Sequence, residues 1–489
     1  IPLIWQGIDK GPPLQRTVES RVEHRHLYRT CQGCPRCRNP CQVRRIMQRC
    51  KVGEFLDGFD HRIGDHNRTG KFLAAVDDTM SHCFDFIDVF DDAVVGIDGT
   101  RAGAVVRTAV CVAGAAVAYF GISSAPTFMD REVVPHIDKW EADQGVSREV
   151  WRKMGRAGFL CPTLPTAYGG LGGDFRFSVI GIEEISRTNH GGLGAPLHSD
   201  IVVPYIMSYG NDTQKRTYLP GCAAGDIVTA VAMTEPGAGS DLSSMTTTAE
   251  EDGGQLVING VKTFISNGIL CDLAIVAAKD PHEKNPHHAI SLYLIEDGTP
   301  GFQKGRPLDK MGLHSQDTAE LFFSNCRIPA ENRLGEKGMG FLMLMEKLQQ
   351  ERLVTAVMGI SVAEVMLDWT MRHCKKTTSS AGRPLSRSQA VQFALVEMAT
   401  DVKLGRTFVD KLVVEHVAGN NVIVETSMAK YWCTELGKRV ADRCLDLVGD
   451  YGGLEQCPLV RGFRDVRVMS IFAGTNEIMK GIAAKFMGL

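Results

Sequence analysis

The hydrophobic pattern of this chain changes period twice, and each change indicates a different kind of secondary structure. Within residues 226 to about 333 the pattern has a period of two, with short runs at 273–278, 290–295 and 321–323, which is typical of strands. Before this region, from residue 128, and after it, from residue 340, apolar residues recur at helical spacing. The pattern predicts a mainly α fold with a small β domain in the middle.

Four long helices are expected after residue 340. Each has an apolar stripe that needs a partner, which favours a C-terminal four-helix bundle. The expected helices cover residues 341–373, 386–417, 423–448 and 475–486.

The β region opens with the stretch VAMTEPGAGSD, residues 231–241. Its glycines and small hydroxylated side chains expose backbone N–H groups, as a bound phosphate or a flavin carbonyl requires. An ordinary surface loop fits the same pattern equally well. Next, the alternation at 255–258, the pair Asn259-Gly260 and the alternation at 261–265 predict a hairpin that turns at Asn259-Gly260.

Charge and cysteine usage narrow the class of protein. A formal net charge of −3 gives no reason to expect nucleic acid or an acidic membrane as a partner. The eight cysteines after residue 124 are scattered singly, which indicates buried free thiols in a reducing compartment. With no apolar run of 18 residues and no signal-peptide layout, we expect a soluble intracellular protein. His198 begins a helical pattern and is interpreted as a capping or core histidine.

Residues 1–124 differ from the rest because they lack a sustained helical or strand period. Cys31, Cys34, Cys37 and Cys41 have the spacing of a ferredoxin-type iron–sulfur run, although Gln42 stands where such a run usually has proline. A cluster or zinc site is one reading. We favour the other, a poorly ordered or non-native extension, and predict no metal site.

The motif MTEPGAGSD, followed some thirty residues later by FISNG, resembles the flavin-binding signature of the acyl-CoA dehydrogenase family. The resemblance runs from about residue 128 to 489 and is closest to the long-chain type. It implies an extension at 1–124, an N-terminal helical domain at 125–229, a middle β-barrel at 230–335 and a C-terminal helical bundle at 336–489. It also implies FAD as cofactor, a homotetramer, and electron-transfer flavoprotein as electron acceptor, in the bacterial cytoplasm or the mitochondrial matrix.

Glu351 lies in an apolar stripe. Leu344, Leu348, Glu351, Thr355 and Met358 are spaced by 4, 3, 4 and 3 residues and share one helix face. Taken alone, this pattern favours a paired structural carboxylate.

The resemblance reverses that reading. Most members of the family carry the catalytic glutamate near the C-terminus, where this chain has Ala473. The long-chain and isovaleryl types place it on the first helix of the C-terminal domain, in a setting that resembles residues 350–353. The resemblance therefore implies that Glu351 is the catalytic base.

The implied reaction is α,β-dehydrogenation of a medium- to long-chain fatty acyl-CoA to the trans-2-enoyl-CoA. Glu351 would take a proton from Cα while a hydride leaves Cβ for the flavin N5. In the family the glutamate's own backbone N–H and a ribityl hydroxyl of FAD stabilise the thioester oxygen. An apolar pocket should raise the pKa of Glu351 and make it a competent base near neutral pH.

The resemblance also assigns contacts residue by residue, with Gln389 reaching the cofactor of a neighbouring subunit and the N-terminus of the last helix favourable for the FAD pyrophosphate. The cofactor contacts are Val231, Met233, Thr234, Gly239, Ser240, Phe264, Ile265, Ser266, Gln389, Asp446, Gly449, Asp450, Thr475, Asn476 and Glu477. The substrate contacts are Ser240, Gln349, Gln350, Arg352, Ala473 and Gly474.

Two positions depart from the family pattern. The motif Arg-x-x-Phe-Gly becomes Thr378, Ala381 and Gly382, so the arginine that binds the FAD pyrophosphate is missing unless Lys375 or Lys376 replaces it. Losing one charge-assisted contact weakens binding by roughly 1.5–3 kcal/mol.

The second departure is in the motif Gln-x-x-Gly-Gly, which becomes Asp446, Gly449 and Asp450 and brings negative charge toward a phosphate. Two alternatives to the dehydrogenase stay open for this chain. One is an acyl-CoA oxidase of the same fold, and the other is a flavin-poor, non-catalytic acyl-CoA binder or scaffold.

Overall fold

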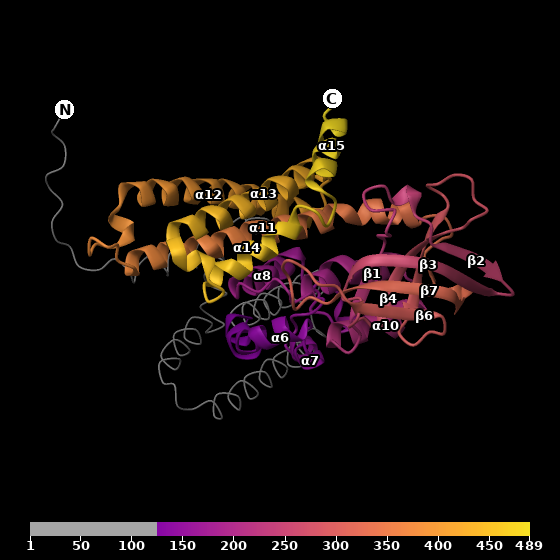
Figure 1. The fold of residues 1–489 in the computed structure, drawn as a ribbon. Coiled ribbons are helices and arrows are strands. Elements are labelled where there is room, and N and C mark those ends of the chain that lie inside the picture. Colours follow the sequence, from indigo (N-terminus) through magenta and orange to yellow (C-terminus); the bar gives the residue numbers. More distant parts are fainter. Residues whose placement is uncertain (1–124) are drawn as a thin grey trace, which may run out of the picture. The chain divides into compact units, whose positions relative to one another are not determined.

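The computed structural model describes residues 125–489, and Figure 1 shows their fold. The expectations for residues 1–124, including the quartet Cys31, Cys34, Cys37 and Cys41, lie outside the described residues.

The first described region is helical, as predicted. Helix α10 shows how its ends are fixed: Asn211 and Gln214 form a reciprocal capping box at its start, and Gly225, with φ +76°, ends it. The region contains η1 (Met129–Val133), η2 (Val134–His136), α6 (Ile137–Asp143), α7 (Arg148–Arg156), η3 (Thr166–Tyr168), α8 (Phe175–Arg187), η4 (Leu197–Val202), α9 (Val203–Tyr209) and α10 (Asp212–Ala224).

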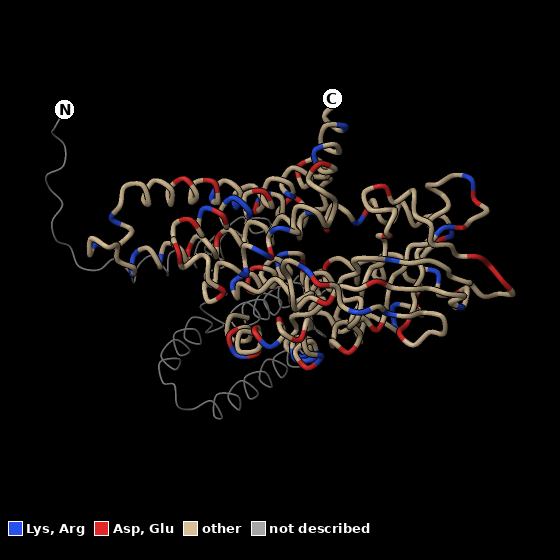
Figure 2. The backbone as a smooth tube through the Cα atoms, in the orientation of Figure 1, with Lys and Arg blue, Asp and Glu red and all other residues tan. Residues whose placement is uncertain are grey.

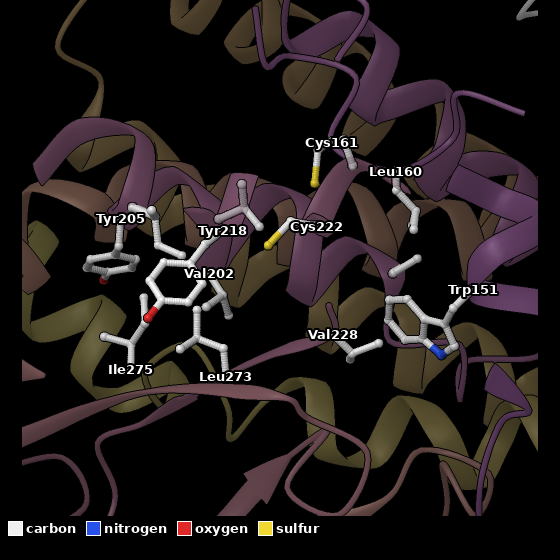
Figure 3. Close-up of a cluster of buried hydrophobic side chains, with 14 of the residues drawn as sticks. Trp151, Leu160, Cys161, Val202, Tyr205, Tyr218, Cys222, Val228, Leu273 and Ile275 are labelled. Carbon is white, nitrogen blue, oxygen red and sulfur yellow. The ribbon is translucent and has the colours of Figure 1, made fainter. Parts of the chain in front are cut away.

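A core joins these helices to the sheet that follows. Figure 3 shows Trp151 of α7 close to Val228, and Tyr218 of α10 close to Leu273 and Ile275 of the sheet, and all five are buried. Because this packing is apolar on both sides, it fixes the helical region against the sheet.

The middle region is an eight-stranded sheet, which confirms the predicted β domain. The strand order is β6-β7-β3-β2-β4-β5-β8, with β1 parallel to β4. The apolar runs predicted at 273–278 and 290–295 are the antiparallel central strands β4 and β5, buried along almost their whole length. The strands are β1 (Thr229–Ala232), β2 (Thr248–Asp252), β3 (Gln255–Ser266), β4 (Leu273–Lys279), β5 (Ile290–Glu296), β6 (Phe302–Pro307), β7 (Thr318–Pro329) and β8 (Arg333–Leu334).

The predicted hairpin turn at Asn259-Gly260 is wrong. Strand β3 continues through these residues, and its register against β7 shifts between Ile258 and Gly260. The chain turns instead at Gly253-Gly254, between β2 and β3, where both residues have positive φ. Two adjacent glycines adopt this conformation without a Cβ penalty and can form the two-residue turn, while the Asn-Gly pair lies inside the longer strand that pairs with β7.

The C-terminal region contains the four predicted helices and one more. Helix α14 (Pro458–Met469) was not predicted, because its twelve residues carry only a short apolar stripe. Ser388 and Thr475 flank α12 and α15 as N-caps and so lie just outside these helices. The elements are η6 (Ala330–Asn332), α11 (Gly340–Lys376), η7 (Leu385–Arg387), α12 (Gln389–Val417), α13 (Ile423–Val448), η8 (Gly449–Gly453), α14 and α15 (Asn476–Phe486).

Helix α11 runs through the centre of this region and packs against α8, α12, α13 and α14. By length and composition it could cross a membrane, but its apolar window is mostly buried inside the protein, as in a core helix. The prediction of buried free thiols is confirmed, since all eight cysteines between residues 125 and 489 are free and buried.

Candidate active site

Glu351 lies on α11 and is 8% exposed. Its Oε2 atom has no hydrogen-bond partner within the described residues. Burial raises the pKa of this carboxyl to about 7, against the opposing influence of the nearby Arg352 and Lys430 charges. A buried carboxyl with an unused oxygen and a pKa near neutrality is equipped to accept a proton from a ligand.

Arg352, the next residue, is also buried and incompletely paired. Its Nη1 atom lies 3.5 Å from Ser427 Oγ on α13, while its Nε has no partner among the described residues. Burying a charge with few partners is unfavourable unless something else satisfies it. The juxtaposition with Glu351 is therefore a signal of a ligand site.

The short π-helix η4 links α11 to the start of the sheet. Gln350 donates from Nε2 to the carbonyl of Asp200 in η4 over 2.6 Å. In the same element, His198 Nδ1 accepts from the backbone N–H of Thr229 in β1 over 3.1 Å. The loop that follows β1 is thus tied through η4 to the helix that carries Glu351.

His198 is a core residue, as predicted. It is fully buried, its Nε2–H donates to the carbonyl of Cys222, and burial lowers its pKa to about 4. It is therefore neutral at physiological pH and acts as a structural link.

The loop after β1 is held from beneath by a buried ion pair that the sequence reasoning missed. Lys262 donates from Nζ to Glu235 over 2.8 Å and to the carbonyl of Met233 over 3.0 Å. Glu235 also accepts from the backbone N–H groups of Thr246 and Thr247. The available signal was a glutamate inside the MTEPGAGSD motif and a lysine two residues before FISNG, neither of which was assigned a role.

Further residues of the expected flavin site lie at the C-terminal end of β3. Phe264 has φ +57° and is 69% exposed, and it sits within a register shift between Lys262 and Ile265. Such a bulge turns a side chain away from the strand's regular alternation. Ser266 is half-buried at the strand's end, whereas Ile265 points into the core of the sheet.

The remaining cofactor contacts expected in this region are half-buried or exposed. Val231, Met233 and Thr234 are half-buried, and Gly239 and Ser240 are exposed. A Cβ built on Gly237 or Gly239 would meet nothing within 4 Å, so the loop is open at that point.

A second strained turn lies before α15. Ala473 and Gly474 both have positive φ, +55° and +87°. The Gly474 carbonyl accepts from Lys430 Nζ over 2.6 Å. A non-glycine residue held in this conformation indicates that surrounding contacts impose the geometry, as at many functional sites.

The expectation that Glu351 uses its own backbone N–H for the thioester oxygen does not fit this structure. Residue 351 lies inside α11, where the N–H is bonded to the carbonyl four residues earlier. Within the described part of the chain, the backbone N–H groups of Ala473 and Gly474 make no hydrogen bond. That turn is therefore the better source of a donor.

At the start of α15, Thr475 caps the helix by accepting from the backbone N–H of Ile478, and Glu477 is exposed in the first turn. Asn476 has an internal role instead. Its side chain bonds to Lys430, Thr434 and Glu435, and its backbone N–H donates to Ser470.

Other expected contacts are not brought together within one chain. Asp446, Gly449 and Asp450 are exposed at the end of α13, about 18 Å along the helix from the residues that contact α15. Gln389 is exposed at the start of α12. Gln349 is engaged internally, since its Oε1 accepts from the backbone N–H of Val422.

The connection between α11 and α12 carries the first departure from the family motif. Thr378 pairs with Pro384, and Gly382, with φ +71°, forms the turn between them. Lys375, Lys376 and Arg383 are exposed in this segment. Figure 2 shows basic residues at this end of the bundle, so positive charge is present although the motif arginine is not.

Comparison with solved structures identifies the class of fold. The chain matches acyl-CoA dehydrogenase from Geobacillus kaustophilus with 50% identity and a TM-score of 0.74, covering 76% of this chain and 98% of that one. Butyryl-CoA dehydrogenase from Megasphaera elsdenii matches with 29% identity and a TM-score of 0.72, covering 76% and 98%. The helix–sheet–helix arrangement is thus the acyl-CoA dehydrogenase fold.

The sequence comparisons agree along the whole described region. Models of the acyl-CoA dehydrogenase N-terminal, middle and C-terminal domains match residues 122–226, 230–326 and 338–488. The long-chain specific acyl-CoA dehydrogenase of Sus scrofa mitochondria is 44% identical over 74% of this chain and 84% of its own length. An acyl-CoA dehydrogenase of Bacillus subtilis is 34% identical over 74% and 95%.

The chain belongs to the acyl-CoA dehydrogenase family. It is accordingly an FAD-dependent flavoprotein oxidoreductase. The residues present fit that cofactor and an acyl-CoA: the loop after β1 is open at its glycines, and the N-terminus of α15 is available beside a strained turn. One oxygen of Glu351 and one nitrogen of Arg352 are buried without a hydrogen-bond partner among the described residues, which leaves both atoms available to a ligand.

Proposed function

We propose that the protein removes hydrogen from Cα and Cβ of a medium- to long-chain fatty acyl-CoA, giving the trans-2-enoyl-CoA, with Glu351 as the base. The observation that carries the proposal is the buried carboxyl of Glu351, with one oxygen unpaired and a pKa of about 7. Long-chain specificity is supported by the names of the mammalian relatives, which are 42–44% identical.

FAD, when bound, supplies the acceptor for the hydride from Cβ. The chain's own contribution is to hold and move the proton: Glu351 Oε2 accepts it from Cα. The Ala473–Gly474 turn then offers backbone N–H groups to the thioester oxygen as negative charge develops there. An acyl-CoA that expels water from around these groups strengthens both interactions, because the local dielectric falls.

The replacement Glu351→Gln tests this role directly. Glutamine keeps the size of the side chain but cannot accept the proton, so the variant should bind FAD, stay yellow and fail to bleach with acyl-CoA under anaerobic conditions. The wild-type protein should bleach. The exposed Glu346→Gln on the same helix is the matched control and should bleach normally. Bleaching by Glu351→Gln at the wild-type rate would place the base elsewhere.

We further propose that the electrons pass to an electron-transfer flavoprotein. A similar solved chain, 32% identical with a TM-score of 0.72, comes from a structure titled as the electron transferring flavoprotein of Acidaminococcus fermentans. We expect the protein to turn over with electron-transfer flavoprotein as acceptor. Without this acceptor it should form no hydrogen peroxide. Peroxide formation in air would favour the oxidase. A colourless protein that takes up no FAD would favour the non-catalytic binder. This alternative is tested because Asp446 and Asp450 are exposed and bring negative charge toward a phosphate of the cofactor.

A homotetramer is proposed on the basis of an exposed apolar stripe. Helix α12 exposes Phe393, Val396, Leu404 and Val414, which lie on one face. An unpartnered stripe of this kind is typical of an interface between subunits. The relatives include mitochondrial and bacterial proteins, which supports a location in the mitochondrial matrix or the bacterial cytoplasm.

A further inference from the structure

Lys430 on α13 is a fully buried lysine whose two hydrogen-bond acceptors are uncharged. Its Nζ donates to the Gly474 carbonyl over 2.6 Å and to Asn476 Oδ1 over 3.2 Å. Among the salt bridges of residues 125–489, none includes Lys430. An ammonium buried without a carboxylate partner is costly, so a purely structural role is a poor explanation for it.

Helix α13 brings this ammonium close enough to the proposed base for the two charges to interact. Arg352 reaches Ser427 on α13, and Lys430 stands three residues further along the same helix, on the same face. The charges interact: Lys430 opposes the rise in the pKa of Glu351, and Glu351 opposes the fall in the pKa of Lys430. Burial lowers the pKa of Lys430 to about 8, so it is mostly charged at pH 7.

Other charged and titratable groups lie near Glu351 and Lys430 and influence how these two residues titrate. Arg352 lies beside Glu351, and the Tyr205 hydroxyl approaches it from α9. Glu435 from α13 and Glu477 from α15 act on Lys430. Unlike these groups, Lys430 both influences the pKa of Glu351 and donates a hydrogen bond to the Gly474 carbonyl in the turn before α15.

We propose that Lys430 is a positioning residue for the reaction: it fixes the Ala473–Gly474 turn through the Gly474 carbonyl and supplies a buried positive charge to the site of Glu351. This inference rests on the proposed role of Glu351. It joins two parts of the site that lie more than 100 residues apart in the sequence. A single side chain thereby orients the turn that offers N–H groups and adjusts the base.

The test is the pH dependence of the rate of anaerobic flavin bleaching, expressed per bound flavin. The acyl-CoA concentration is kept low, because the rate then depends on the pKa values of the protein before substrate binds. In the wild type the bleaching rate should rise with pH as Glu351 ionises, and this rise is the Glu351 limb of the profile. In Lys430→Met the limb should move to higher pH by about one unit. Bleaching at pH 7 should fall by about fivefold as less of the base is ionised, and the loss should shrink above pH 9. Lys430→Arg keeps the charge and should keep the limb near its wild-type position.

Lys430→Gln keeps a hydrogen-bond donor without the charge, and it should shift the limb even if Lys430→Met fails to fold. Lys310→Met is the matched control, because Lys310 is a half-buried lysine that also donates to a backbone carbonyl, that of Gln316, but has no role in the proposed site. Its limb should stay in place. An unshifted limb in both neutral variants of Lys430, with rates reduced equally at every pH, would overturn the proposal. If Glu351→Gln still bleaches, the base assignment fails instead, so the two failures are distinguishable.

Discussion

The ammonium of Lys262 lies 2.8 Å from the carboxylate of Glu235, and both side chains are almost completely buried. Burial alone would raise the pKa of Glu235, but hydrogen bonds from Lys262 and Thr247 bring it down to about 2. The glutamate is thus ionised, and the pair joins β3 to the loop that follows β1.

Breaking this pair should loosen the flavin loop. Lys262→Met leaves the Glu235 charge buried and unpaired, and we expect it to lower the free energy of unfolding by about 3–5 kcal/mol and to release FAD. The double variant Lys262→Met/Glu235→Leu removes both charges and should recover much of the stability. Urea unfolding and flavin titration measure the two effects. Equal losses in the single and double variants would contradict this account.

Replacing the base should stabilise the protein in a pH-dependent way. The pKa of Glu351 is raised to about 7 in the folded protein, against about 4.3 in an unfolded chain. Between these values the folded state binds more protons, so the free energy of unfolding falls as pH rises through this window.

Glu351→Gln escapes that loss. At pH 8 it should be more stable than the wild type by an amount on the order of 1–3 kcal/mol, and the difference should vanish near pH 4. Denaturant unfolding at both pH values with saturating FAD gives the comparison. A difference that is the same at pH 4 and pH 8 would show that the effect is packing and not ionisation.

Restoring the missing motif arginine should tighten FAD. Thr378 is exposed in the connection between α11 and α12, so Thr378→Arg can be accommodated and should gain roughly 1.5–3 kcal/mol, at least tenfold in Kd. Ser380→Arg adds the same charge two residues away, also at an exposed position. If both variants tighten FAD equally, the gain is general electrostatic attraction and the register assigned to Thr378 is wrong.

Charging the apolar stripe of α12 should dissociate the assembly. Leu404 is 61% exposed, and Leu404→Glu would bury a charge if a second copy covers it. We expect tetramer for the wild type and smaller species for the variant by light scattering. Lys403→Glu, at the neighbouring exposed position, is the control and should stay tetrameric. A monomeric wild-type protein would rule out the tetramer.

The sequence by itself determined the helix–sheet–helix order and put Glu351 in an apolar stripe. These features depend on local periodicity, which each segment carries independently of its neighbours. Helix α14 was not predicted because its apolar stripe is short. The hairpin turn was placed at Asn259-Gly260 because this pair competes with the nearby turn signal Gly253-Gly254.

Only the tertiary structure decided which polar groups meet. Lys262 finds Glu235 across 27 residues and Lys430 finds the Gly474 carbonyl across 44, and no spacing rule predicts such pairs. The helix α11 likewise uses the backbone N–H of Glu351 for its own hydrogen bonding, while the turn at Ala473–Gly474 keeps its N–H groups unbonded among the described residues. Burial shifts a pKa and selects a hydrogen-bond partner through the packing of distant segments, and this information is absent from any one stretch of the chain.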